Sequence, residues 1–523
     1  MGWARTRMMQ APALVAFGTL VVGLVDIVTA IRPTLTDRYD LFQAMLPPDA
    51  ATLARSITFA AGVALLVLSG GLARRKRRAW MLASALVIFA AAAHVARGGF
   101  DVEQAAGSAA LLLALVALRR RFDVAGDPTS LRPLAGGVAA SGVAWATVAL
   151  VGGAHTNRVA NAGFEMLLAG GAFWALHHWL RAHREPAHAS DSDRIRARHL
   201  VQRYGRDSLS FFTLRADRRY SFSRHGNAFL AYRVVAGCAL VSGDPIGAAR
   251  EIPGLIEDFG ALCHERGWRM VVLHTSEEWL DLYRRRGMRA VAIGDEAVLR
   301  PATFSLEGRA VRKVRQSVTR LRKLGFEVRV VAPSEVTAAW RSEIDRVTRE
   351  WRGRSAERGF SMAMDDLYAH EQARFALALD AAGRVRGFLH LVPSGGGYSL
   401  SAMRRGGGTP NGMMEFLICE ATVWAGSAGA EELSLNFSVF ADVLRADEDS
   451  PAHLRAARQI VVGLDRAFQL DRLFSFNRKF QPEWRTRYIC FERARDVPVL
   501  SFATLHAERL LAPPGLRPGR STG

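Results

Sequence analysis

Six long apolar runs occupy the first third of the chain, and the remaining two thirds contain no run of comparable length. A helix needs about 17 to 20 mostly apolar residues to cross the hydrocarbon core of a bilayer. We therefore expect residues 1–184 to form a membrane α-helical bundle with about six spans. The runs lie at roughly 11 to 31, 56 to 73, 79 to 96, 104 to 118, 134 to 153 and 161 to 180.

The basic residues beside these runs predict the orientation of the bundle, because Lys and Arg near the ends of membrane helices stay in the cytosol. If the N-terminus is inside, the inner loops hold the basic clusters at 74–78 and 119–121, whereas the outer loops hold only isolated arginines. An even number of spans then places both termini in the cytosol. We expect a multi-pass plasma-membrane protein whose first run is a retained anchor.

The composition restricts the partners of the chain. It has 69 Lys and Arg against 49 Asp and Glu, which gives a formal net charge of +20. Such an excess of cations favours anionic partners, either membrane head groups or nucleic acid, and does not choose between them. The 4 cysteines are far apart and form no C-x-x-C pair, which argues against a zinc knuckle or a disulfide framework.

The last two thirds of the chain read as a folded cytosolic domain. A polar stretch at 185–198 predicts a linker, and the domain is expected at 199–515. Short β-rich runs alternate there with helical patterns, which indicates a mixed α/β fold. A comparable succession begins again after Gly325 and predicts two lobes, at about 199–325 and 326–515.

One segment of this domain carries an unusual charge. Residues 308–325 contain seven basic side chains and no acidic one, while Val311, Val314, Val318 and Leu321 recur at helical spacing. This pattern predicts an amphipathic helix with a cationic outer face. A solvated surface helix is one explanation. Like charges at this density repel one another, so a phosphate-bearing partner, either anionic lipid or RNA, is the other.

Several common chemistries lack their motifs in this sequence. There is no G-x-x-x-x-G-K-[ST] phosphate loop, no G-x-S-x-G nucleophile elbow, no H-E-x-x-H and no dinucleotide G-x-G-x-x-G after a strand. ATP hydrolysis, serine hydrolysis and zinc catalysis lose support, and we assign no metal. The remaining motifs are compact groups of Gly, Pro, Asn and charged residues, each weak by itself.

In combination and in this order, these motifs resemble the C-terminal domain of the bacterial phosphatidylglycerol lysyltransferases, the multiple-peptide-resistance-factor family of aminoacyl-phosphatidylglycerol synthases. The resemblance covers roughly residues 200 to 490. The pieces that carry it are GDPIG at 243 to 247, IGDEAVLRPATFSLEGRAVRKVRQSV at 293 to 318, Trp351 with Glu357 and the GFS at 359 to 361, MRR with PNGMMEFL at 403 to 417, and KFQPEW with Arg487-Tyr488 at 479 to 488.

This resemblance implies two acetyltransferase-like (GNAT) lobes in a bacterial membrane enzyme. Aminoacyl-tRNA would enter from the cytosol and phosphatidylglycerol from the membrane, and the lipid glycerol hydroxyl would attack the aminoacyl ester. The modified lipid would change the surface charge of the membrane and its resistance to cationic antimicrobials. An ester exchange needs alignment, proton transfer and an oxyanion site, so no cofactor is expected. A homo-oligomer is possible.

The resemblance also suggests which residues act. Arg404, Glu415, Glu357 and Ser401 are the candidates for the reaction centre. The candidates for substrate binding are Gly243, Asp244, Gly247, Arg312, Lys313, Arg315, Trp351, Asn411, Gly412, Lys479, Phe480 and Trp484.

One departure from the family pattern leaves the function open. The family usually has an Asp in the strand before Met-Arg, as in D-L-M-R, and this chain has Ser401 there. A serine cannot act as a carboxylate base, so Glu415 or Glu357 would have to replace it. Two alternatives remain: the same fold could act on another lipid or envelope acceptor, or the protein could be a non-catalytic membrane lipid-binding sensor.

Overall fold

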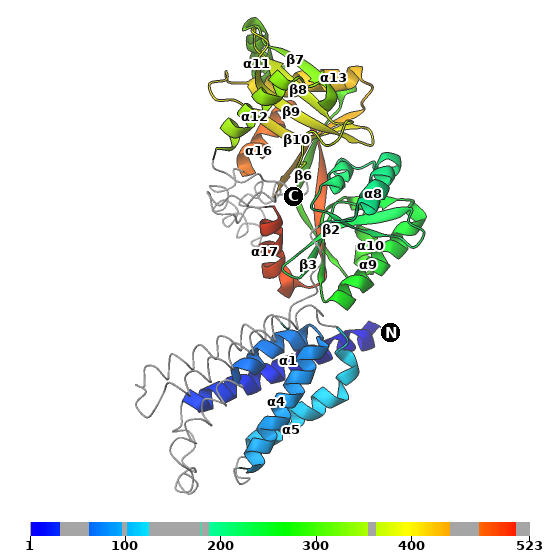
Figure 1. The fold of residues 1–523 in the computed structure, drawn as a ribbon, viewed down its shortest axis with the longest axis vertical. Coiled ribbons are helices and arrows are strands. Elements are labelled where there is room, and N and C mark those ends of the chain that lie inside the picture. The colour runs from blue at the N-terminus through cyan, green and yellow to red at the C-terminus, as the bar shows by residue number, and fades with distance from the viewer. Residues whose placement is uncertain are drawn as a thin grey trace. The chain divides into compact units, whose positions relative to one another are not determined.

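The computed structural model describes residues 2–31, 62–96, 102–124, 179, 188–353, 362–439 and 470–508. The chain forms two units, of which the first comprises 1–184 with 261–268 and the second 185–260 with 269–523. Figure 1 shows the first unit as helices and the second as a long sheet flanked by helices. Glu357 and the surrounding 354–361 lie outside the described residues.

The first unit contains α1 (Gly2–Ile31), a helix at 62–73, α4 (Arg77–Ala96), α5 (Val102–Ala117) and the 3-10 turn η2 (Arg119–Arg121). The helices pack through small and branched apolar side chains, including Leu65, Leu68, Leu72, Ala79, Ala83 and Leu115. Other apolar side chains of these helices are exposed, among them Leu14, Phe17, Ile88 and Leu113.

The first four predicted spans fall wholly or partly on these helices, and the fifth and sixth lie outside the described residues apart from position 179. Within the described ranges, no helix combines the length and the apolar character that crossing a membrane requires. The six-span bundle stays a prediction.

The second unit is built on one mixed sheet with the strand order β1-β2-β3-β5-β12-β6-β11-β10-β9-β8-β7, and β4 pairs with β2 outside this path. The strands are β1 (Arg219–Phe222), β2 (Ala228–Val235), β3 (Cys238–Ser242), β4 (Ile246–Gly247), β5 (Arg269–Thr275), β6 (Arg289–Leu299), β7 (Glu327–Val331), β8 (Arg374–Leu379), β9 (Val385–Ser394), β10 (Gly397–Arg405), β11 (Glu432–Val439) and β12 (Glu483–Phe491). The expected α/β architecture is confirmed.

The position of β12 joins the two halves of this sheet. It follows all the other strands in sequence, yet it pairs antiparallel with β5 on one side and with β6 on the other. β6 in turn pairs with β11, so the sheet continues without a break from β1 to β7. The predicted division into two lobes at residue 325 did not include this arrangement, in which β12 of the second lobe lies between two strands of the first lobe, β5 and β6.

Helices cover the sheet on both faces because strands such as β3 and β8 carry buried side chains in succession, and successive side chains point to opposite faces. On β8, Phe375 and Leu377 belong to a core with α12 (Ala338–Arg352), whereas Ala376 and Ala378 belong to a core with α13 (Met413–Ser427). The other helices are α8 (Asp191–Tyr204), α9 (Ile252–Arg266), α10 (Leu280–Arg285), α11 (Arg312–Lys323), α16 (Leu470–Asn477) and α17 (Val497–Ala507).

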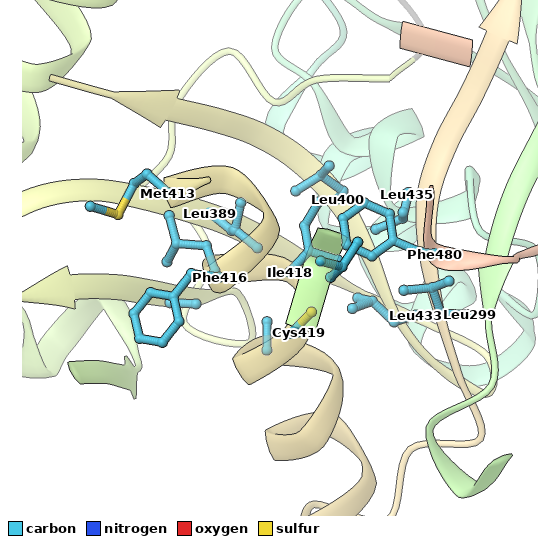
Figure 2. Close-up of a cluster of buried hydrophobic side chains, with 14 of the residues drawn as sticks. Leu299, Leu389, Leu400, Met413, Phe416, Ile418, Cys419, Leu433, Leu435 and Phe480 are labelled. Carbon is cyan, nitrogen blue, oxygen red and sulfur yellow. The ribbon is translucent and has the colours of Figure 1, made fainter. Parts of the chain in front are cut away.

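The predicted amphipathic helix is present as α11. Val314, Val318 and Leu321 are buried on its inner face, in the same core as α13. Figure 2 shows that core, where Phe416 and Ile418 of α13 lie among leucines of the sheet and Phe480 closes it from the segment before β12. Phe480 therefore serves as a core residue.

Candidate active site

The parallel strands β10 and β11 stop pairing partway along their length. Their register covers only Gly397–Ser399 against Glu432–Ser434. Beyond it, Ser401 is an extra residue in β10 relative to β9, because Leu400 opposes Leu391 while Ala402 opposes His390. Such bulges often occur beside active sites, and ligands of α/β sheets bind beyond the carboxyl ends of parallel strands.

Side chains bridge the two strands where the backbone pairing ends. Asn436 on β11 has a φ of 69° and donates from Nδ2 to the carbonyls of Leu400 (2.9 Å) and Met362 (3.0 Å). Ser401 is buried, and its Oγ accepts a hydrogen bond from the Met364 amide at 3.0 Å. Ser401 thus fixes the local backbone.

Arg404 lies at the end of β10 in a mixed polar and aromatic surrounding. Its side chain is buried, and Nη1 donates to Thr348 Oγ1 at 2.9 Å. The guanidinium lies 5.8 Å from the Trp351 ring and 5.9 Å from the Phe388 ring. Trp351 itself is 57% exposed, so the structure brings together two predicted site residues, one buried cation and one accessible ring.

Glu415 and Lys479, both predicted site residues, form an ion pair with 2.8 Å between Oε1 and Nζ. Lys479 also lies 4.9 Å over the Phe476 ring. The Glu415 carboxylate is held by a cation, so a role as proton acceptor would require this pair to open.

Trp484 stacks on Phe474, with ring centroids 4.9 Å apart.

Asn411 and Gly412 lie in the loop between β10 and α13, where they contact α11. Arg320 donates to the Asn411 carbonyl, and Gly412 has a φ of 90°, which favours glycine. A Cβ at Gly412 would lie 2.5 Å from Ser317 Oγ. Both predicted binding residues therefore have a structural role in this loop.

The outer face of α11 carries the predicted cations. Arg312 and Lys313 are exposed, whereas Arg315 is half-buried and donates to the Gly308 carbonyl at 3.1 Å. An open hollow of about 420 Å³ lies along this face, and its lining residues are Arg315, Gln316, Thr319, Arg320, Lys323 and Leu324.

The GDPIG motif forms a turn at the carboxyl ends of the parallel strands β3 and β5. Gly243 has a φ of 72° and donates its amide to the Leu273 carbonyl at 2.8 Å. Gly247 has a φ of 144°, and a Cβ there would lie 2.2 Å from Ala228 Cα. The turn holds Asp244 so that its Oδ1 accepts from Thr275 Oγ1 at 2.6 Å and from the Ser276 amide at 2.9 Å.

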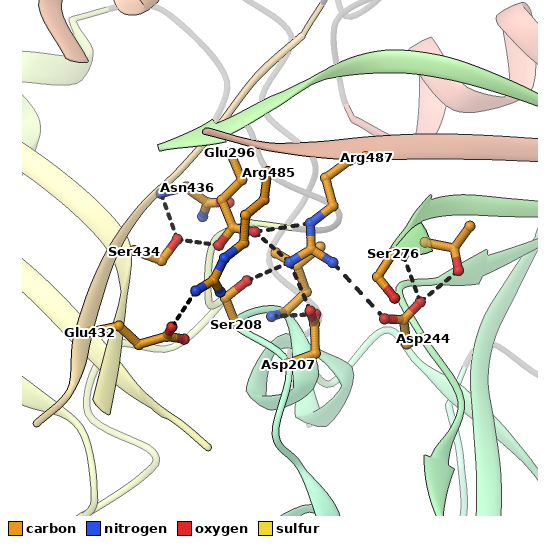
Figure 3. A network of polar contacts seen from close by, with 12 residues as sticks. Asp207, Ser208, Asp244, Ser276, Glu296, Glu432, Ser434, Asn436, Arg485 and Arg487 are labelled. Carbon is orange, nitrogen blue, oxygen red and sulfur yellow. Dashed lines mark hydrogen bonds and ion pairs between the residues drawn. The ribbon is translucent and has the colours of Figure 1, made fainter. Parts of the chain in front are cut away.

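A buried ion cluster around Arg487 lies next to this turn (Figure 3). Arg487 on β12 donates from Nε to Glu296 on β6 at 2.9 Å and from Nη2 to Asp207 at 2.7 Å. Its Nη2 also donates to Ser208 Oγ at 2.9 Å, and its Nη1 lies 4.0 Å from Asp244 Oδ2. We call Asp207, Asp244, Glu296 and Arg487 the Arg487 cluster.

Polar contacts continue from the Arg487 cluster to the end of β10. Ser434 Oγ donates to Glu296 Oε1 at 2.6 Å and accepts from the Asn436 amide at 3.0 Å. Asn436 then contacts the carbonyl of Leu400, beside Ser401. The structure thereby connects the two parallel-strand ends, and the candidate site extends across the sheet between them.

The sequence alone indicates no role for Arg487 or Glu296. Both stand in segments that carry the resemblance, IGDEAVLR and Arg487-Tyr488. The available signal was the presence of charged residues within two strands, Arg485 and Arg487 in β12 and Asp295 and Glu296 in β6. A strand with one solvated face shows the same pattern, so these residues do not distinguish a buried ion cluster from a solvated face.

Burial and neighbouring charges set the protonation of the cluster. Burial raises the pKa of Asp244 to about 6, and the charge of Asp207 adds to this rise. Burial also acts to raise the pKa of Glu296, but the charge of Arg487 and the hydrogen bonds from Arg487, Ser208 and Ser434 together outweigh it, so the pKa lies below its usual range. Burial lowers the pKa of nearby His274 to about 3, and Arg487 contributes, so this ring is neutral at pH 7.

Comparison with known proteins gives the family. The family model described as phosphatidylglycerol lysyltransferase, C-terminal, matches residues 198–491. The α/β domain is thus a phosphatidylglycerol lysyltransferase C-terminal domain by this match, and the chain belongs to that family.

Two curated relatives share 38% identity with the chain, and each is named lysylphosphatidylglycerol biosynthesis bifunctional protein LysX. The match to the protein of Rhodococcus jostii extends over 347 residues, 65% of this chain and 31% of the relative. The match to that of Mycobacterium tuberculosis extends over 338 residues, 63% of this chain and 28% of the relative. The chain thus spans about a third of the length of these relatives.

Two solved structures share the fold of the second unit. L-PGS from Bacillus licheniformis matches with a TM-score of 0.53 and 23% identity, over 62% of this chain and 99% of that chain. A C-terminal domain from Agrobacterium fabrum matches with a TM-score of 0.53 and 22% identity over the same shares.

We predict that Arg487→Ala lowers the free energy of unfolding by about 3 to 5 kcal/mol, because it leaves the buried Glu296 carboxylate without its cation. The matched control is Arg485→Ala on the same strand. Its partner Glu432 keeps Arg300 at 3.5 Å, so the loss should be about 1 kcal/mol or less. Urea unfolding followed by tryptophan fluorescence measures both. Equal losses would contradict the central role of Arg487.

The raised pKa of Asp244 predicts a pH-dependent difference between Asp244→Asn and the parent protein. The folded state holds the Asp244 proton more tightly than the unfolded state, so this group favours folding most below pH 4 and less as the pH rises through about 6. Asparagine does not ionise. The melting temperature of Asp244→Asn relative to the parent should therefore increase between pH 4 and pH 7. A constant difference would show that Asp244 keeps an ordinary pKa.

Proposed function

We propose that this protein transfers an aminoacyl group from aminoacyl-tRNA to the glycerol hydroxyl of phosphatidylglycerol. The observation that carries the proposal is the family match over residues 198–491, which contains both Arg404 and the Arg487 cluster. The curated relatives are named for lysylphosphatidylglycerol biosynthesis, which supports a lipid acceptor. A lipid of altered charge would change the membrane surface and its resistance to cationic antimicrobials.

The reaction is an exchange of esters. The lipid hydroxyl oxygen bonds to the aminoacyl carbonyl carbon, a tetrahedral oxyanion forms, and the bond to the tRNA ribose oxygen then breaks. The proton of the lipid hydroxyl finally resides on that ribose oxygen. The site must align two substrates, move this proton and stabilise the oxyanion.

Arg404 is our candidate for holding a phosphate or the oxyanion, since a guanidinium offers a rigid fork of donors to such groups. Its bond to Thr348 and the neighbouring aromatic rings position that fork. Ser401 lacks the basicity to accept the proton. Glu357 or Glu415 is proposed for that role, and the second would have to leave Lys479.

The exposed face of α11 is our candidate surface for the tRNA phosphates. Arg309, Arg312, Lys313 and Lys323 are exposed, and none of them has an ion-pair partner in the part of the chain that the structure describes. A 12-residue helix extends over about 18 Å at 1.5 Å per residue, which is enough to reach several phosphates of one strand.

The proposal includes a membrane location for the first unit. The exposed Arg77, Arg119 and Arg120 of its basic clusters and its exposed apolar side chains, such as Leu14 and Phe17, support contact with an anionic bilayer. We place the protein in the bacterial plasma membrane as a multi-pass protein with both termini in the cytosol. Two GNAT-like lobes would then lie where aminoacyl-tRNA is available.

A non-catalytic lipid-binding sensor is the second candidate function. Ser401 replaces the usual aspartate, and its hydroxyl is already bound to the Met364 amide, which favours a structural role at that position. Transfer to another lipid or envelope acceptor is a variant of the first candidate. The mass of any lipid product separates these cases.

We predict that Arg404→Ala removes most of the aminoacylated lipid made by the parent protein in a host that lacks such an enzyme. Loss of one oxyanion donor costs about 2.7 to 4 kcal/mol, or roughly a hundredfold to a thousandfold in rate. Mass spectrometry of extracted lipids gives the yield and the transferred amino acid. The exposed neighbour Arg405→Ala is the matched control and should keep near-parent yield.

Two outcomes would contradict this assignment. Equal yields from Arg404→Ala and the parent would exclude Arg404 from the reaction centre. No new lipid from well-expressed parent protein, together with the appearance of an aminoacylated lipid in Ser401→Asp, would show that the chain is a catalytically silent relative.

Ser401→Ala should lower the yield of aminoacylated lipid less than Glu415→Gln or Glu357→Gln if one of those carboxylates accepts the proton.

We predict that reversing Arg312, Lys313 and Lys323 to Glu weakens tRNA binding and flattens its salt dependence. Each lost phosphate contact removes about one unit from the slope of log affinity against log salt. The matched control reverses Arg250, Arg285 and Arg289, three exposed arginines outside α11. Filter binding over a salt series measures the slope. If the α11 variant bound tRNA like the control but lost affinity for phosphatidylglycerol vesicles, the surface would serve lipid instead.

A further inference from the structure

We propose that the Arg487 cluster forms a subsite for the α-ammonium group of the aminoacyl moiety, with Asp244 as the carboxylate that recognises it. The inference rests on the proposed aminoacyl transfer and adds a specificity-determining residue to it.

The cluster holds more negative than positive charge. Asp207, Asp244 and Glu296 surround a single guanidinium, and the side chains of Asp244, Glu296 and Arg487 are 7%, 1% and 3% exposed. Burying a carboxylate without a matching cation is costly. When Asp244 is ionised, this excess of negative charge is one that an incoming cation would balance.

Asp244 is the carboxylate of the cluster with the longest contact to Arg487. The hydrogen bonds of Arg487 go to Asp207, Glu296 and Ser208. Asp244 stays 4.0 Å from Nη1, beyond hydrogen-bond distance, although Thr275 and Ser276 orient it toward that atom (Figure 3). The structure therefore orients Asp244 firmly, while its ion pair with Arg487 includes no hydrogen bond.

Donors also remain available beside Asp244. Within the described residues, Arg487 Nη1 and the hydroxyl of Tyr283 are buried and have no hydrogen-bond partner. Tyr283 is fully buried and lies close enough to Asp244 for its charge to raise the tyrosine pKa further, after burial itself. The subsite thus offers one carboxylate acceptor and two donors.

This combination matches the reacting end of an aminoacyl ester. Its ammonium group carries three donors and a positive charge for Asp244, and its adjacent carbonyl oxygen is an acceptor for Arg487 or Tyr283. A metal ion fits less well, because none of the described His, Cys, Asp and Glu side chains are grouped as metal ligands. An α-ammonium is common to every aminoacyl group, so the subsite would recognise the class and not one amino acid.

The turn that carries Asp244 is built around its position. Gly243 and Gly247 adopt backbone conformations that side chains disfavour, and the close approach of Gly247 to Ala228 leaves no room for a Cβ. The turn lies at the carboxyl ends of β3 and β5, where parallel sheets bind their ligands. The two glycines of the GDPIG motif then form the turn that positions its aspartate for the ligand.

The test measures calorimetric binding of the methyl esters of L-lysine and L-alanine, and of their Nα-acetyl forms, to the purified full-length protein. Parent protein should bind the esters with a free α-ammonium about tenfold or more tighter than the acetylated forms, as expected for a hydrogen bond to a charged group. Asp244→Asn should lose this preference. Asp295→Asn, a buried aspartate bonded to Thr486, is the matched control and should keep it.

Thr275→Val gives a second variant that preserves every charge. It removes the hydrogen bond that orients Asp244, so the preference should fall by less than in Asp244→Asn. The inference is overturned if the parent shows no preference or if Asp244→Asn keeps it. Lipid mass spectrometry on the same variants separates the two proposals: aminoacyl-lipid made by a parent without ester preference leaves the transfer standing and removes only the subsite.

Discussion

The ion pair between Arg487 and Glu296 joins parts of the chain that are 191 residues apart. It is buried where β12 pairs with β6, and β6 is the strand through which the first half of the sheet reaches the second. Arg487 also contacts Asp207 and Ser208, in the segment after α8. The pair therefore fixes the relative position of three segments, and both candidate strand ends depend on it.

The sequence predicted the kind of fold but not how its halves connect. Alternating apolar runs predicted the α/β domain, and Val314, Val318 and Leu321 predicted the buried face of α11, because both patterns are local. The insertion of β12 between β5 and β6 depends on pairing with strands that lie about 185 to 220 residues earlier. No local pattern encodes that choice, since several strands have similar apolar faces.

The candidate site was predicted in part for the same reason. The resemblance drew attention to Arg404, Trp351 and Asp244, and the structure brings the first two together. Several other predicted residues have clear structural roles, such as Phe480 in the core and Gly412 in the loop before α13. Arg487 was not predicted as a site residue because its contacts with Asp207, Ser208 and Glu296 form only in the folded chain.

The resemblance implies an aspartate where this chain has Ser401, and Ser401 lies at one end of the polar path across the sheet. Ser401 stands at a bulge, one step from the Leu400 carbonyl that Asn436 holds, and Asn436 leads through Ser434 to Glu296. A carboxylate at Ser401 would add another negative charge to a path that already ends in three. A serine at position 401 and the three carboxylates of the Arg487 cluster are thus compatible in one site. The negative charge that an aminoacyl ammonium requires would then be concentrated at Asp244.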